Sequence, residues 1–315
     1  MTWHRPSGST ARDGWDVVIE PDASGWEHTG LYAAELAPGE TRALASRDRE
    51  FVVVPLSGSV TVSSEDAHGR HSATLTGRPS VFAGPTDVAY VPAGSSFTVE
   101  AVESARVAVC FAVAGKSDAV RSFRHVAADE VPVELRGSGV ASREVRNFGT
   151  PGVLDADSII ACEVITPSGN WSSYPPHKHD EERPGEETQL EEIYYFETQP
   201  VETVFRPRTG GSTSAFDTET VFRGEGGGAG GVGYLHLGGV GDTHEVRSGD
   251  VVLVPRGWHG PAMVPPGYDL YYLNVMAGPG RERAWLICDD PAHAWVRETW
   301  TSQDVDPRLP LGGSR

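Results

Sequence analysis

The chain has 315 residues, of which 38% are hydrophobic, so it is long enough for two ordinary domains or one large β-structure with a real core. Its formal net charge is -18 and its pI is near 5.0, and such a surface repels nucleic acids and anionic membranes alike. We therefore expect no nucleic-acid partner and no membrane partner.

The cellular compartment is predicted from the absence of secretory, membrane-spanning and paired-cysteine motifs in the sequence. The polar segment Met1–Trp15 has no apolar stretch of the kind found in secretory signals, and no run approaches the roughly 18 apolar residues of a membrane span. The three cysteines, Cys110, Cys162 and Cys288, are far apart and form no CxxC motif. This indicates neither a disulfide framework nor a zinc ribbon. We predict a soluble, cytoplasmic protein with buried free thiols.

Short β-rich runs dominate the chain, and long helical periodicity is nearly absent. In the first half, strands are predicted at Phe51–Pro55, Val60–Ser63, Val88–Pro92, Ser96–Val102 and Ala105–Val113. In the second half, they are predicted at Ser158–Thr166, Ile193–Thr198, Gly231–Leu237, Val251–Pro255 and Leu270–Ala277. Many of these runs alternate apolar and polar residues between Gly, Pro, Ser or Asp, which is typical of antiparallel sandwiches and barrels. The predicted fold class is all-β.

An internal repeat relates the two halves. The segments Gly84–Gly94 and Arg247–Gly257 both contain Asp-Val-x-x-Val-Pro-x-Gly. Upstream, Glu50 precedes Phe-Val-Val-Val in the way that Glu192 precedes Ile-Tyr-Tyr-Phe. Two copies of one β-barrel explain the chain length.

We place one barrel in residues 1–140 and the other in residues 141–315, because the polar stretch Arg136–Asn147 contains the glycines and serines of a junction. The second copy carries an insertion, Pro200–Gly230, that is rich in Gly, Ser and Thr. This insertion is predicted to be a long surface loop near the mouth of the second barrel.

The second half contains a candidate metal site. In an extended segment, residues i and i+2 share a face, so His177 and His179 are expected to point into the barrel together. Glu192 enters a strand, and His259 follows a distant strand that ends in Val-Pro-Arg-Gly. Three His and one Glu form a ligand set for a divalent ion such as Zn, Mn or Fe. On an octahedral ion they leave two positions for adjacent substrate oxygens.

This arrangement resembles the cupin pattern, and longer strings are more specific. They are Thr166–Asp180 (TPSGNWSSYPPHKHD), Gly267–Gly278 (GYDLYYLNVMAG) and Asp289–Trp295 (DDPAHAW). Together they resemble the 5-deoxy-glucuronate isomerase family of the IolB type, which is related to uronate isomerases of pectin breakdown. The resemblance implies a bicupin of two tandem jelly-roll-like barrels and a role in myo-inositol catabolism.

The match to the family pattern is incomplete at several positions. Trp258 and Gly260 flank the last ligand where family members usually have Tyr and Pro. Glu191 competes with Glu192 for the ligand role, and we favour Glu192 because of its parallel with Glu50 and the apolar run that follows. The first copy has no HxH motif, so its barrel is expected to be structural.

The resemblance implies an aldose–ketose isomerisation that converts 5-deoxy-D-glucuronate, a small anionic sugar acid, to 5-dehydro-2-deoxy-D-gluconate. Such chemistry needs a Lewis acid on the carbonyl and its neighbouring hydroxyl, and a base that moves a proton between two carbons. The base candidates are Glu192 itself, Asp180, Tyr194 and Tyr272. Lys178 and Arg256 flank the ligands and are the candidates for binding the substrate carboxylate.

Other readings of the same residues stay open. A cupin dioxygenase would use these ligands with Fe or Cu, and a non-catalytic cupin would bind or sense a sugar. No basic patch or helix-turn-helix segment supports a DNA-binding regulator. A homo-oligomer remains compatible with the sequence.

Overall fold

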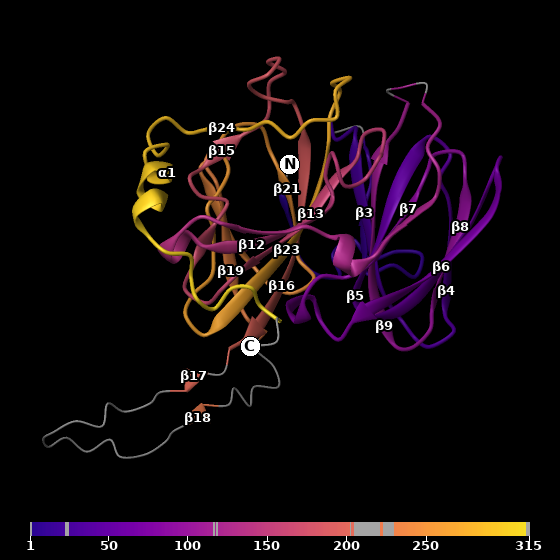
Figure 1. The fold of residues 1–315 in the computed structure, drawn as a ribbon, viewed down its shortest axis with the longest axis horizontal. Coiled ribbons are helices and arrows are strands. Elements are labelled where there is room, and N and C mark those ends of the chain that lie inside the picture. The colour runs from indigo at the N-terminus through magenta and orange to yellow at the C-terminus, as the bar shows by residue number, and fades with distance from the viewer. Residues whose placement is uncertain are drawn as a thin grey trace, which may run out of the picture.

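The computed structural model describes residues 2–22, 25–115, 117, 119–201, 203–204, 221–222 and 230–312. Strands make up most of its regular structure, and the one α-helix among these residues is α1 (Val296–Thr299), which confirms the all-β prediction. The two halves of the chain form two β-units side by side (Figure 1). No helix of this part of the chain is long and apolar enough to cross a membrane. Most of the predicted insertion Pro200–Gly230 lies outside the described residues.

The first unit is built around β5 (Arg49–Asp66). Its beginning pairs with β7 and β9, and its end pairs with β6 and β8. The register shifts between Pro55 and Ser57, and such a bulge bends a strand, so the predicted segments Phe51–Pro55 and Val60–Ser63 are one strand that serves two sheets. The other strands of this unit are β2 (Val17–Ile19), β3 (Thr29–Leu36), β4 (Thr41–Ala45), β6 (Gly69–Arg78), β7 (Val88–Val91), β8 (Ser96–Ala101), β9 (Ala105–Val113) and β10 (Arg124–Val126).

The second unit repeats the strand order of the first. Its main sheet runs β1-β21-β16-β23-β13-β12-β11, where the first unit has β10-β7-β5-β9-β3-β2. The main strands are β1 (His4–Arg5), β11 (Val133–Arg136), β12 (Arg143–Gly149), β13 (Ile160–Thr166), β16 (Glu191–Pro200), β21 (Val251–Val254) and β23 (Tyr268–Ala277). The smaller strands are β14 (Trp171–Ser172), β15 (His177–Lys178), β17 (Thr203–Val204), β18 (Val221–Phe222), β19 (Gly233–Leu237), β20 (Asp242–Val246), β22 (Ala262–Met263) and β24 (Cys288–Asp289).

The pairing register corrects one detail of the predicted repeat. Phe51 lies opposite Val91, and Glu192 lies opposite Val254, which is the matching valine of the second Val-Pro-x-Gly motif. Glu50 therefore corresponds to Glu191, and the parallel drawn between Glu50 and Glu192 was wrong by one residue. In a strand, a shift of one residue moves a side chain to the opposite face. Phe51 thus occupies in the first barrel the position that Glu192 occupies in the second.

Glu50 and Glu191 make equivalent contacts across the junction of the two units. The Glu50 carboxylate accepts hydrogen bonds from the backbone N–H groups of Asp157, Ser158 and Ile159, which lead into β13. The Glu191 carboxylate accepts them from Glu27, His28 and Thr29, which lead into β3. Each unit therefore fixes the entry of a central strand of the other.

A shared core joins the two units. Each barrel has its own apolar interior, and a third cluster between them combines side chains of both halves. Within it, Val52 and Val54 of β5 face the junction, as do Ile193 and Tyr195 of β16. Buried ion pairs cross the same junction, including Arg78 with Glu163. The strand pairing also crosses the predicted boundary at residue 140. Strands β1 and β11 precede that residue, yet both pair with strands of the second unit. The division of the chain into 1–140 and 141–315 stays a prediction.

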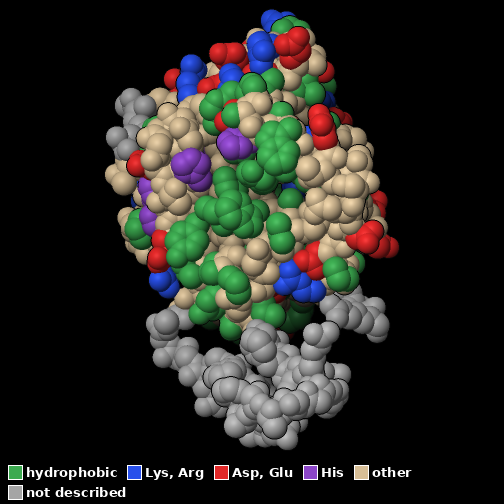
Figure 2. All heavy atoms as spheres, turned by 90° about the vertical axis from the view of Figure 1, so that its left-hand side faces the viewer, with side chains coloured by type: hydrophobic (Ala, Val, Ile, Leu, Met, Phe, Trp, Pro, Cys, Tyr) green, Lys and Arg blue, Asp and Glu red, His purple; other side chains and the backbone are tan. Residues whose placement is uncertain are grey.

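The C-terminal segment lies against the second barrel. Figure 2 shows hydrophobic side chains gathered on the side of the molecule that carries α1. Trp171 and Trp295 are exposed there, and the Trp171 ring packs edge-on against Tyr174, with 6.0 Å between ring centroids. The connected strand β24 pairs with β15, which begins at His177. This pairing brings the C-terminal segment to the candidate metal ligands.

Candidate metal centre

Four strands and loops of the second unit bring the predicted metal ligands together. His177 begins β15, His179 follows that strand, Glu192 lies near the start of β16, and His259 follows β21. His177 and His259 lie directly opposite each other: the N–H of each donates to the carbonyl of the other, at 3.0 and 2.9 Å. This backbone pair explains how histidines distant in the sequence meet.

The side chains of the four residues are buried and close to one another. Nε2 of His179 lies 3.0 Å from Oε2 of Glu192, and Nε2 of His259 lies 3.1 Å from the same oxygen. The rings of His177 and His259 have centroids 4.4 Å apart. Ligand atoms of His179, Glu192 and His259 all lie within 4.8 Å of one another. His177 is not part of this group, but its ring lies beside that of His259.

Hydrogen bonds hold two of these side chains in an orientation that suits metal binding. Nδ1 of His177 faces the carbonyl of Pro175 at 3.3 Å, and Nδ1 of His179 faces that of Leu190 at 3.2 Å. A histidine held in this way by Nδ1 leaves Nε2 free to bind a metal. Both ring nitrogens of His259 are buried, and neither makes a hydrogen bond of good geometry to a described residue, although Nε2 faces the Glu192 carboxylate at 3.1 Å. Because a buried polar atom normally has a well-aligned partner, this ring fits a divalent ion as that partner.

The charges of the cluster also suit a cation. Burial lowers the pKa of His177 well below its usual value, as do the neighbouring His259 and His179, and burial likewise lowers the pKa of His259. Burial alone would raise the pKa of Glu192, but contacts with His179 and His259 hold it well below its usual range. The carboxylate, in turn, raises the pKa of His179 against the effect of burial. Glu192 ionised and His177 and His259 neutral is the state in which these groups bind metals, and metal binding would displace a proton from His179.

The barrel interior forms a cavity of about 410 Å³ against this cluster. His177 and Glu192 line it together with Tyr194 and Tyr272, two of the predicted catalytic residues. The two phenol oxygens lie 3.1 and 3.2 Å from Oγ of Ser173. The remaining lining residues are Arg136, Arg143, Val145, Val164, Pro175, Asn274, Trp285, Ile287, Asp289 and Arg297.

Both tyrosines are protonated at neutral pH. Burial raises the pKa of Tyr272 to about 12, and burial together with the Glu192 charge raises that of Tyr194 well above its usual value. The protonated phenols are therefore hydrogen-bond donors and not resting bases, and Tyr272 donates to Oγ of Ser172 at 2.9 Å.

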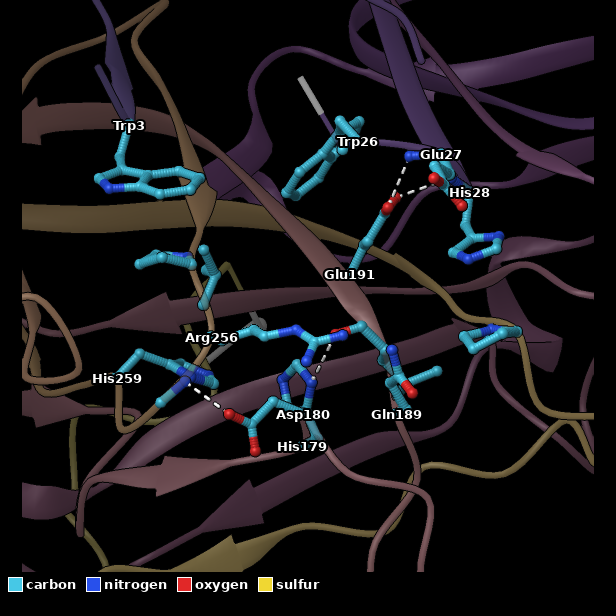
Figure 3. Close-up of a pocket in the computed structure, with 16 residues that line it drawn as sticks. Trp3, Trp26, Glu27, His28, His179, Asp180, Gln189, Glu191, Arg256 and His259 are labelled. Carbon is cyan, nitrogen blue, oxygen red and sulfur yellow. Dashed lines mark hydrogen bonds between the residues drawn. The ribbon is translucent and has the colours of Figure 1, made fainter. Parts of the chain in front are cut away.

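Two other predicted residues lie at a second cavity, of about 220 Å³, on another side of His179 and His259 (Figure 3). Arg256 extends across it, and Asp180 lies at its edge. Asp180 is already engaged, because one carboxylate oxygen accepts from Lys178 and the other from the N–H of Gly257, at 2.7 Å each. Asp180 thereby positions the loop that carries His259.

Lys178 does not reach the barrel cavity. Its ammonium contacts the carboxylates of Asp180, Glu181 and Glu187, and it lies over the ring of Trp258 at 5.8 Å. Since Lys178 alternates along the chain with His177 and His179, a strand that turns both histidines inward turns the lysine outward.

The sequence interpretation missed several residues of the cavity. Asn274 donates to Oε1 of Glu192 at 2.5 Å and so orients that carboxylate. Ser173 joins the two phenols, and Arg143 adds a cation to the wall. Alternation could have found Arg143, because it lies two residues before Val145, an interior residue of β12. The segment was instead interpreted as a polar junction.

Comparisons with known proteins give a consistent picture. The family model described as KduI/IolB matches residues 3–296. A protein of Geobacillus kaustophilus named 5-deoxy-glucuronate isomerase is 38% identical over 295 residues, which cover 93% of this chain and 95% of that protein. One of Bacillus subtilis strain 168 with the same name is 35% identical over 297 residues, covering 93% and 97%.

Solved structures extend the comparison to the fold. An IolB-like protein from Salmonella typhimurium LT2 is 30% identical with a TM-score of 0.76, and the match covers 94% of this chain and 99% of that one. Oxalate decarboxylase from Lactobacillus farciminis is 12% identical with a TM-score of 0.53, over 83% and 79% of the two chains. These likenesses confirm the predicted bicupin fold.

Proposed function

The chain belongs to the KduI/IolB family, and we propose that it is a 5-deoxy-glucuronate isomerase. The observation that carries this proposal is the buried His–Glu cluster at the wall of the barrel cavity, in a chain whose relatives bear that name over almost their whole length. In the proposed reaction, an aldehyde becomes a primary alcohol and the neighbouring hydroxyl becomes a ketone. One carbon is reduced as the other is oxidised, so no external oxidant or reductant is needed.

We propose that His177, His179, Glu192 and His259 hold one divalent ion, which would supply Lewis acidity toward the carbonyl and the adjacent hydroxyl. Zn, Mn and Fe all suit this donor set. The chain itself prepares the ligands: Asn274 holds Glu192, and backbone carbonyls hold the imidazoles.

The cavity residues have separate tasks in this proposal. The protonated phenols of Tyr194 and Tyr272 donate hydrogen bonds to substrate oxygens and stabilise negative charge as it develops. Val145, Val164 and Ile287 supply apolar walls that limit water near the reacting carbons. Among the four base candidates, Glu192 is the one carboxylate that lines this cavity, so we assign the proton transfer to it.

The test is an anaerobic assay. Zn-loaded protein is mixed with 5-deoxy-D-glucuronate, and formation of 5-dehydro-2-deoxy-D-gluconate is followed. Turnover without oxygen or nicotinamide is expected, because the reaction has no net redox change and Zn supplies Lewis acidity alone. Strict dependence on oxygen, or activity only with a redox-active metal, would instead favour the cupin dioxygenase.

A further inference from the structure

Three arginines line the barrel cavity, and they differ in their partners. Arg136 pairs with the carboxylate of Glu134, and Arg297 pairs with that of Asp289. Arg143 has no carboxylate within 4.0 Å among the residues that the structure describes. The positive charge of Arg143 is therefore the one that the cavity wall leaves uncompensated.

The surroundings of Arg143 make an uncompensated charge energetically unfavourable, because the residue is buried. The residue is 5% exposed, and its guanidinium donates one hydrogen bond, to the carbonyl of Ala141, in the described part of the chain. One face stacks on the ring of Trp300, with 5.2 Å between the guanidinium carbon and the ring centroid. Burial, together with the neighbouring charges of Arg136 and Arg297, lowers the pKa of Arg143 to about 10. A buried cation is normally paired, and a guanidinium has more N–H donors than this single bond uses.

Arg146, on the same strand, shows what a purely structural arginine looks like in this protein. It is fully buried on the opposite face of β12, where it donates to the Glu144 carboxylate and to the carbonyls of Val81 and Gly84. Its charge is compensated within the fold, whereas that of Arg143 faces a cavity large enough for a small molecule.

The cavity lining thus combines candidate metal ligands with an uncompensated cation. His177 and Glu192 belong to its lining, and so does Arg143, together with Arg136 and Arg297. A ligand that carries vicinal oxygens at one end and an anionic group at the other matches both. Guanidinium groups bind carboxylates through two parallel N–H···O bonds, which fixes orientation as well as charge.

We infer that Arg143 is the specificity-determining residue that binds the carboxylate of the sugar acid, while the opposite end of the substrate faces the His–Glu cluster. This inference rests on the proposed function, because that function makes the substrate a uronate. It replaces Lys178 and Arg256, the cations favoured by the sequence, since neither lines the barrel cavity.

The experiment compares two sugars that differ only in this group. Binding of D-glucuronate and of D-glucose to the full-length, Zn-loaded protein is measured by calorimetry for the wild type, Arg143→Met and Arg143→Lys. We expect glucuronate to bind more tightly than glucose, Arg143→Met to weaken glucuronate about a hundredfold, and glucose to change little. Lysine keeps the charge but loses the bidentate geometry, so Arg143→Lys should fall between the two.

Arg283→Met is the matched control, because Arg283 is a part-buried arginine that donates to the carbonyls of Gly149, Leu154 and Ile159, away from the cavity lining. Its loss should lower thermal stability while glucuronate still binds in preference to glucose. The inference is overturned if folded Arg143→Met retains that preference, if Arg283→Met loses it equally, or if the wild type binds both sugars alike. Carboxylate recognition through Arg143 without turnover of 5-deoxy-glucuronate would sink the proposed function and leave the inference standing.

Discussion

The adjacent residues Glu191 and Glu192 should respond in opposite ways to the same substitution. Glu192→Gln removes the charge that the histidine cluster surrounds, so we expect loss of both metal and activity. Glu191→Gln leaves that cluster intact but disturbs the junction of the two units, so we expect metal and most of the activity to remain while stability falls.

The size of the stability loss follows from the contacts of Glu191. Its oxygens lie 2.6, 2.8 and 3.0 Å from the backbone nitrogens of Glu27, His28 and Thr29. Glutamine keeps one acceptor oxygen and turns an NH₂ group toward N–H donors. Hydrogen bonds to charged groups contribute about 1.5–3 kcal/mol each, and Glu27 is exposed, so a loss of about 2 kcal/mol is expected. For a chain of this size, that corresponds to a fall in Tm of about 5 °C.

The assay measures metal content, turnover and thermal unfolding for both variants in parallel. Glu186→Gln is the control, since it removes the same charge from an exposed side chain and should change stability by less than about 0.5 kcal/mol. The reasoning is refuted if Glu191→Gln loses the metal while Glu192→Gln keeps it, because the strand register would then be the reverse of the one described. It is also refuted if Glu191→Gln is as stable as the control.

Three further outcomes are expected. His259→Ala and His177→Ala should each lose the divalent ion, measured as metal per chain, and stoichiometric metal bound by the N-terminal unit would contradict this. Arg256→Met should keep glucuronate binding near the wild-type level, because its side chain lies at the other cavity. Burial would raise the pKa of Glu187, but Arg183 and the N–H groups of Asp180 and Glu181 lower it to about 2. Its stabilisation is therefore complete above the unfolded pKa near 4.5 and lost toward pH 2. The gap between wild type and Glu187→Gln, about 3 kcal/mol at pH 7, should close over that range in urea unfolding.

Much of the fold could be predicted because alternation and repeats are local signals. The predicted strands Ala105–Val113 and Leu270–Ala277 appear as β9 and β23, and the latter begins two residues earlier. The repeat of Val-Pro-x-Gly predicted two β-units, and the structure contains two. The short edge strands β1 and β11 carried no such signal, because their pairing with the second sheet depends on where the two units meet.

In the candidate site, too, sequence patterns identified the residues that a local spacing defines and missed those that depend on tertiary contacts. His177 and His179 were identified from i, i+2 spacing, which a strand obeys whatever its partners are. Glu192 lies beside His179 and His259, whereas the parallel with Glu50 that favoured it over Glu191 was wrong, because sequence similarity alone does not define the pairing register. Lys178 and Arg256 were favoured for being near the ligands in the sequence, whereas Arg143 reaches the cavity from a strand 34 residues before His177.

The first unit has no counterpart of the proposed ligand Glu192, but it contacts the strand that carries this residue. Phe51 fills in the first barrel the position of Glu192, and its ring packs against Phe97 and Phe111, so an apolar core replaces the ligand cluster. The residues before Phe51 and Glu192, which are Glu50 and Glu191, make equivalent contacts. Each carboxylate accepts hydrogen bonds from backbone N–H groups at the start of a strand in the other unit. Because Glu191 is the immediate neighbour of Glu192, the contact that joins the units also fixes the start of the strand that carries Glu192. The position of Glu192 within the second barrel therefore depends on a contact with the first barrel.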